Sequence, residues 1–202
     1  MPSEAYQQFL DSMVMDFDKW HDGTSYDLET LEQLGSEGRV SIEELLITNL
    51  KEAGDWRDVE ALTALGSDSA RKAVDQARFH NNTKVRKYAL RICLNTQDLK
   101  DRTKEDIAEL EEQVVQAVKH GGFQIAEYMS TPRVKKTLLD SILGFKSEIR
   151  VSAVAFLLYL CGQAPEPFDW SQRPFFLRFS DSERDPKMRQ LAWEHLRKRT
   201  GL

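Results

Sequence analysis

Cysteine is scarce in this sequence, where Cys93 and Cys161 are the only two among 202 residues. A fold held together by several disulfides is therefore excluded, and a single disulfide between the two stays open. Both lie in predicted helices among apolar neighbours and lack the basic neighbours that activate a thiolate. We expect buried, unreactive thiols in a reduced compartment.

Long apolar runs and an excess of positive charge are also missing. The longest apolar run, residues 151–161, is well short of the ~20 residues that span a bilayer, and the opening MPSEAYQQF lacks the basic and apolar regions of a signal peptide. We therefore expect a cytoplasmic protein with no membrane partner. The net charge of −5, from 28 Lys and Arg against 33 Asp and Glu, disfavours a nucleic-acid partner and fits a basic protein partner better.

Motifs that carry catalysis or bind metals are absent as well. The sequence has no glycine-rich phosphate loop, no G-x-S-x-G, no HExxH and no paired-cysteine zinc motif. The segment DFDKWHD, residues 16–22, comes closest to a metal site. On a helix, however, only Asp18 shares a face with His21 or Asp22, and a divalent metal needs more ligands than such a pair.

The remaining histidines, His80, His120 and His195, each lie near a predicted helix C-terminus, where a cationic side chain complements the helix dipole. None has an orienting partner nearby in sequence, which a catalytic histidine needs. We therefore expect no enzyme, no metal, no cofactor and no small-molecule ligand.

Helical periodicity runs through nearly the whole chain, and the alternation typical of β-strands is almost absent. The predicted helices run from Ser3 to near Gly23, from Asp27 through Leu34, and over residues 42–50 behind a Ser41 and Glu44 capping box, 55–65, 67–80, 83–95, 103–120, 123–129, 132–144 and 148–161, before a final helix. The links are only a few residues long, which favours antiparallel neighbours in an all-α fold.

The sequence repeats itself at an offset of 64 residues without a gap. Residues 65–94 then fall on residues 129–158, and the pair Val85-Arg86 meets Ile149-Arg150. The agreement concentrates at apolar positions and at this one arginine. An offset of 64 is two units of about 32 residues, a period typical of stacked helical hairpins.

The segments NNTKVRKYALRICL and FKSEIRVSAVAFLL, residues 81–94 and 145–158, resemble the second helix of HEAT repeats. The resemblance implies a short right-handed α-solenoid of helical hairpins in a single domain, 1–202, with repeats over 55–161 between capping elements at 1–54 and 162–202. The usual turn aspartate of the repeat is replaced by Asn82 and Ser147, so its capping role falls to weaker acceptors or is lost.

Three further segments, residues 17–31, 55–66 and 166–179, are similar to parts of a bacterial family of small HEAT-like proteins, some of which accompany polymorphic toxins as immunity proteins. This resemblance implies a non-catalytic protein that binds and neutralises a cognate toxin. Two alternatives are a general HEAT-repeat scaffold or adaptor and a HEAT-like DNA alkylpurine glycosylase. The glycosylase needs a broad basic groove, which the acidic balance disfavours.

In a HEAT-type solenoid, the second helix of each hairpin lines a concave surface that binds partners. We expect Trp56 either to anchor a partner or to pack in the core. The predicted outward positions are Arg57, Asp58, Glu60, Lys84, Lys87, Arg91, Gln124, Glu127 and Glu148.

The segment APEPFDWSQRPFFLRFS, residues 164–180, gathers five aromatic residues between prolines. It is either a binding platform or a cap over the last repeat, and the need of a repeat stack for a covered end favours the cap. The cap predicts that the phenylalanines enter the core. Trp170 and Arg173 are then the candidates for a surface contact. The phenylalanines concerned are Phe168, Phe175, Phe176 and Phe179.

Overall fold

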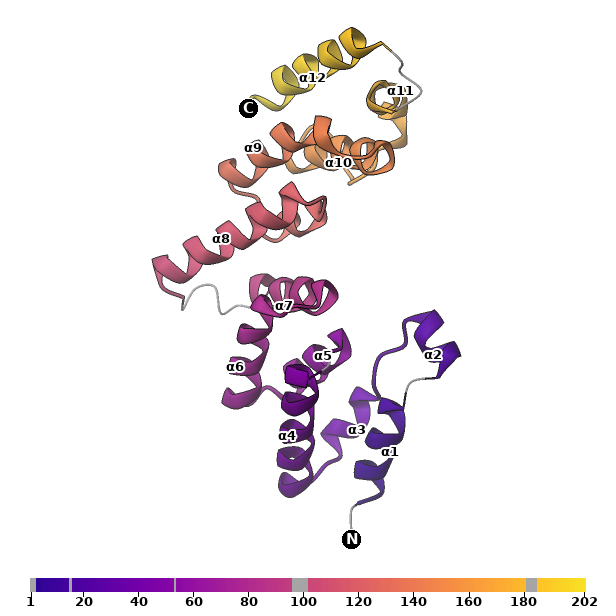
Figure 1. Cartoon of the computed structure of the whole chain (residues 1–202), viewed down its shortest axis with the longest axis vertical. Helices are drawn as coiled ribbons and strands as arrows, with labels where there is room; N and C mark the ends of the chain where they lie inside the picture. The colour runs from indigo at the N-terminus through magenta and orange to yellow at the C-terminus, as the bar shows by residue number, and fades with distance from the viewer. Residues whose placement is uncertain (1–2, 15, 53, 96–101, 181–184) are drawn as a thin grey trace. The chain divides into compact units, whose positions relative to one another are not determined.

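The computed structural model describes residues 3–14, 16–52, 54–95, 102–180 and 185–202. These residues form α-helices and short 3-10 helices and contain no strand, which confirms the all-α class (Figure 1). No helix among them is long and apolar enough to cross a membrane. The chain divides into two compact units, Met1–Asp98 and Leu99–Leu202.

The N-terminal unit is a series of helices in which α5 packs against α3, α4, α6 and α7. Its elements are α1 (Glu4–Met13), α2 (Phe17–Asp22), α3 (Leu28–Glu32), α4 (Ser36–Glu52), α5 (Trp56–Leu65), α6 (Asp68–Gln76), the 3-10 helix η1 (Ala77–Phe79) and α7 (Thr83–Asn95). Its core contains the fully buried side chains of Phe9, Ile42, Leu46 and Leu62.

Two predicted helix boundaries in this unit are wrong. The predicted first helix is two helices, because the extended backbone of Val14 ends α1 and Asp16 accepts a hydrogen bond from the Lys19 N–H at the start of α2. Helix α4 begins at Ser36, so Ser41 lies inside it and the predicted capping box does not form. In the first turn of α4, the Arg39 guanidinium donates to the backbone carbonyls of Leu31 and Leu65 and so ties this turn to two other segments.

The link between α4 and α5 requires glycine at position 54. Gly54 has φ +64°, and a Cβ there would lie 2.4 Å from Cε1 of His80. The Gly54 carbonyl accepts a hydrogen bond from the side-chain amide of Asn82 at 3.1 Å. Both contacts fix this link against the turn between η1 and α7.

The C-terminal unit begins with a helical pair, α8 (Lys104–Lys119) and α9 (Pro132–Ser141), joined through the 3-10 helix η3 (Phe123–Glu127). Its other elements are η4 (Ile142–Gly144), α10 (Ser147–Leu160), η5 (Trp170–Gln172), α11 (Arg173–Phe176), η6 (Leu177–Phe179) and α12 (Pro186–Thr200). The predicted helix 123–129 is thus a single 3-10 turn.

The internal repeat appears as two hairpins with the same local structure, α6-η1-α7 and α9-η4-α10. Ser67 and Thr131, which are 64 residues apart, cap the first helix of each hairpin. Ala89 and Ala153 are fully buried at equivalent positions of the second helices. The match concerns the internal structure of each hairpin, and the arrangement of hairpins into a solenoid stays a prediction.

The equivalent arginines of the repeat both hold the turn that precedes their helix. Arg86 donates to the carbonyl oxygen of His80 at 2.8 Å, and Arg150 donates to that of Phe145 at 2.6 Å. The turn aspartate is replaced effectively in the first hairpin, where Asn82 Oδ1 accepts from the Lys84 N–H at 2.9 Å. In the second, Lys146 occupies the N-cap without a side-chain hydrogen bond.

The aromatic segment contributes to the core of the C-terminal unit. Phe176 and Phe179 are fully buried, as the capping prediction requires, whereas Phe168 and Phe175 are half-buried. Arg150 donates to the Phe179 carbonyl at 3.0 Å and so ties this segment to α10.

Neither cysteine forms a disulfide. Cys93 is buried as predicted, while Cys161 is only half-buried. Burial nevertheless raises the pKa of the Cys161 thiol, which makes it a poor nucleophile at neutral pH.

Candidate protein-binding surface

Two helices of the N-terminal unit bring four of its aromatic and charged residues together. Trp56 and Glu60 lie one turn apart on α5, and Tyr88 and Arg91 lie one turn apart on α7. The rings of Trp56 and Tyr88 have centroids 5.3 Å apart, and the Tyr88 hydroxyl donates to Oε1 of Glu60 at 2.9 Å. The Arg91 guanidinium carbon lies 4.4 Å from the Tyr88 ring centroid. We call these four residues the Trp56–Tyr88 cluster.

The cluster is accessible to a partner. Arg91 is exposed, and the other three side chains are half-buried. Oε2 of Glu60 is buried and has no hydrogen-bond partner among the described residues. Burial raises the pKa of Tyr88, and its hydrogen bond to the Glu60 carboxylate raises it further, so the phenol stays a donor at neutral pH. The cluster therefore offers aromatic surface and an exposed arginine to a partner.

A basic row flanks the cluster on α7. Lys84, Lys87 and Arg91 follow one another at spacings of three and four residues, which places them on one face of the helix. All three are exposed. Neither lysine forms an ion pair with any described residue. The surface thus combines an aromatic pair with charges of both signs.

The predicted outward positions of Arg57 and Asp58 are wrong, because only 4% and 2% of these residues is exposed. They occupy the first turn of α5, where Asp58 accepts from the Asp55 N–H at 3.0 Å and closes a capping box. The residues before α3 cover this turn: Arg57 Nε donates to the Thr24 carbonyl at 2.6 Å, and the Tyr26 hydroxyl donates to Asp58 at 3.0 Å.

This buried network supports the cluster from within the unit. The Arg57 guanidinium carbon lies 4.8 Å from the centroid of the Trp56 ring, and the same ring also contacts Tyr88. Burial raises the pKa of Asp58 although its hydrogen bonds from Asp55 and Tyr26 oppose the change. Arg57 and Asp58 therefore position the start of α5 and do not reach a partner themselves.

In the C-terminal unit, the predicted residues occupy separate places. Trp170 is 68% exposed, and the Arg173 guanidinium lies 5.9 Å from its ring centroid. Glu127 is exposed and accepts a hydrogen bond from the Tyr159 hydroxyl at 3.2 Å. Glu148 is exposed in the first turn of α10.

The structure thus gathers Trp56, Glu60 and Arg91 at one place, with Lys87 beside them on α7. Sequence reasoning missed Tyr88, which joins the two helices. The helical spacing could have indicated it, because Tyr88 lies three residues before Arg91 and so shares a helix face with this exposed basic residue.

The metal alternative near the N-terminus depended on Asp18, whose side chain lies outside the described residues. Among the side chains that the structure describes, no group of three or more His, Cys, Asp and Glu is placed to hold a metal ion.

Comparison with protein-family models, curated proteins and solved structures finds no significant match for this chain. The membership in a HEAT-like family that the sequence segments imply therefore stays a prediction.

Proposed function

We propose that this chain is a non-catalytic protein-binding module whose partner contacts the Trp56–Tyr88 cluster. The observation that carries the proposal is the cluster itself, in which two helices present a tryptophan, a tyrosine and an arginine at an accessible place. These three residue types dominate the binding energy of protein interfaces.

The charged residues at the cluster indicate which kind of partner surface complements it. The exposed row of Lys84, Lys87 and Arg91 fits carboxylates on a partner, because opposite charges across an interface favour the correct pairing. A partner with an acidic patch next to an apolar or aromatic one complements this surface.

The more specific form of the proposal is an immunity protein that neutralises a cognate bacterial toxin by occupying its active site or substrate groove. Its support is the resemblance of residues 17–31, 55–66 and 166–179 to a bacterial family of small HEAT-like proteins, some of which accompany toxins as immunity proteins. The first of these segments contains Thr24 and Tyr26, and the second contains Arg57 and Asp58, so the resemblance falls on residues that hold α5 in place.

Co-expression tests both forms. The product of the adjacent upstream gene is produced alone and together with this chain, and growth and complex formation by pull-down are measured. We expect growth arrest by the first protein alone, rescue by this chain, and a stable complex. A complex with a protein that is harmless alone identifies a scaffold instead. Absence of both rescue and complex contradicts the toxin form.

A matched pair of variants tests the surface. Arg91→Ala removes the exposed arginine of the cluster, and Arg71→Ala removes an exposed arginine of α6 in the same unit. An interface hot spot contributes about 2 kcal/mol or more, so we expect Arg91→Ala to weaken binding about 30-fold and Arg71→Ala to leave it unchanged. Equal affinities of the two variants contradict the assignment of the cluster.

A further inference from the structure

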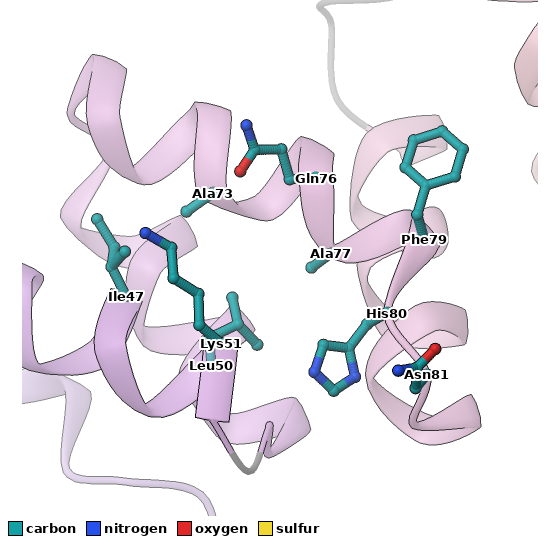
Figure 2. A pocket seen from close by; sticks show the side chains of 9 residues that line it. All are labelled: Ile47, Leu50, Lys51, Ala73, Gln76, Ala77, Phe79, His80 and Asn81. Carbon is teal, nitrogen blue, oxygen red and sulfur yellow. The ribbon is translucent and has the colours of Figure 1, made fainter.

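A pocket of about 310 Å³ opens in the N-terminal unit between α4 and α6 with η1, among residues other than those of the Trp56–Tyr88 cluster (Figure 2). Its apolar lining comes from Ile47 and Leu50 of α4 and from Ala73 and Ala77 on the other side. The two alanines leave the space open, because longer side chains at these positions would fill it. A volume of this size accommodates an aliphatic or aromatic side chain.

Lys51 and His80 are among the hydrogen-bond donors that line the same pocket, together with the side-chain amides of Gln76 and Asn81. The ammonium group of Lys51 makes no hydrogen bond or ion pair with any described residue. Nδ1 of His80 accepts from the Asn82 N–H at 3.0 Å, which leaves the proton of the neutral ring on Nε2. Figure 2 shows the other ring nitrogen of His80 facing the side where Lys51 and Leu50 lie. Among the described residues that line the pocket there is no carboxylate, so its charge complement is an anionic group beside an apolar one.

The exposure of Phe79 favours a polypeptide over a small molecule as the occupant of the pocket. Phe79 also lines the pocket, yet 59% of it is exposed. A small molecule seated among Ile47, Leu50 and Ala77 leaves this ring in water, whereas a length of polypeptide that crosses the pocket covers it. Aromatic side chains at such a rim are frequent anchors for a protein partner.

We propose that this pocket receives a segment of the partner protein in which an aliphatic or aromatic side chain stands next to an aspartate or glutamate. The apolar side chain lies on Leu50, Ala73 and Ala77, and the carboxylate pairs with the ammonium group of Lys51, while His80 borders the same pocket. The close approach of His80 to Gly54 keeps the imidazole in place before the partner arrives. This inference rests on the proposed protein-binding function and names a second contact for the same partner.

The test uses the full chain labelled with ¹⁵N and two capped tetrapeptides, acetyl-Ala-Leu-Glu-Ala-amide and acetyl-Ala-Leu-Lys-Ala-amide. Amide chemical shifts are followed during titration. We expect the peptide with glutamate to shift the signals of residues 47–51 and 73–81 in a saturable way, and the peptide with lysine to bind at least tenfold more weakly. Equal binding of the two, or shifts confined to other residues, overturns the proposal.

Charge reversal provides the matched control. Lys51→Glu exchanges the free ammonium for a carboxylate, and Lys72→Glu makes the same change at an exposed position of α6 that does not line the pocket. We expect Lys51→Glu to reverse the preference between the two peptides and Lys72→Glu to preserve it. An unaltered preference in Lys51→Glu overturns the assignment of the anion site.

Two further experiments distinguish a peptide from a small acid as the occupant, and the pocket proposal from the proposal for the Trp56–Tyr88 cluster. The acid 4-methylpentanoate carries the same groups without a peptide chain, and binding as tight as that of the peptide overturns a polypeptide occupant. In the pull-down, loss of the complex with Arg91→Ala but full retention with Lys51→Glu overturns the pocket proposal alone. Peptide binding with the expected charge preference, without any complex in co-expression, supports the pocket and counts against the proposed partner.

Discussion

Replacement of Arg150 by methionine tests whether the repeat arginine holds the aromatic segment onto the C-terminal unit. The guanidinium of Arg150 is buried, with 7% of the residue exposed. It donates to the Phe145 carbonyl from Nε and Nη2 at 3.2 and 2.6 Å and to the Phe179 carbonyl from Nη1 at 3.0 Å. Methionine keeps an unbranched apolar stem but leaves both carbonyls without this donor.

The expected loss follows from these bonds. Hydrogen bonds from a charged group contribute about 1.5–3 kcal/mol each, so two buried carbonyls lose about 3–6 kcal/mol together. Removal of a buried charge returns part of this free energy. We therefore expect the free energy of unfolding of the C-terminal unit to fall by about 3 kcal/mol. For a unit of this size the midpoint of thermal unfolding then drops by roughly 12–24 °C.

Arg86→Met in the N-terminal unit is the matched comparison. Arg86 is the equivalent arginine of the repeat, but it is half-exposed and donates to the His80 carbonyl and, near solvent, to the Thr83 hydroxyl. Because water replaces these bonds, we expect a loss of about 1 kcal/mol. Thermal unfolding followed by circular dichroism, with hydrogen exchange to assign each loss to its unit, measures both. A loss in Arg150→Met no larger than that in Arg86→Met refutes the reasoning.

Three further predictions concern stability. Phe176→Ala removes a fully buried ring and costs about 3–5 kcal/mol in urea unfolding, whereas the half-buried Phe175→Ala costs roughly half as much; equal losses contradict the burial order. Gly54→Ala costs at least about 1 kcal/mol from its left-handed backbone and more from displacement of His80, so a stable variant in the same assay contradicts the close contact. Burial raises the pKa of Tyr26 far above the ordinary tyrosine value of about 10, so the unfolded chain loses this proton first as pH rises. Below about pH 10 the N-terminal unit should keep the full contribution of Tyr26 to its free energy of unfolding, and this contribution should decrease as the pH rises further. Tyr26→Phe should remove the contribution. Tyrosinate absorbance and unfolding, followed over the same pH range, measure the titration and the loss of stability.

Helix starts that carry their own capping residue were predictable from the sequence. Ser67, Thr103 and Thr131 each accept a backbone hydrogen bond at the start of a helix, close to the predicted boundary. Such a cap involves residues within one turn, so the local sequence contains all the information needed. The repeat was visible for the same reason, since its apolar positions recur at a fixed spacing.

Boundaries fixed by distant residues were not predictable. Helix α4 starts at Ser36, before Ser41, and Arg39 in its first turn donates hydrogen bonds to the carbonyls of Leu31 and Leu65 from other segments. The residues around Ser41 in the sequence do not indicate that Arg39 contacts Leu31 and Leu65. Local propensity there yields to tertiary hydrogen bonds.

The candidate surface was likewise predictable only where local spacing decides which residues are exposed. Helical spacing placed Glu60 and Arg91 on accessible faces correctly. It failed for Arg57 and Asp58, because the residues around Tyr26, about thirty positions earlier, cover the start of α5. A single sequence gives the face of a helix but not the loop that lies over it.

The affinity of this chain for the product of the adjacent upstream gene tests the central proposal most directly. Isothermal titration calorimetry on the purified proteins compares the wild type with Trp56→Ala and with Arg71→Ala, after circular dichroism has shown that each variant is folded. We predict a complex that Trp56→Ala weakens about 30-fold or more and Arg71→Ala leaves unchanged. An affinity that is the same for all three proteins contradicts the proposal that the Trp56–Tyr88 cluster binds the partner.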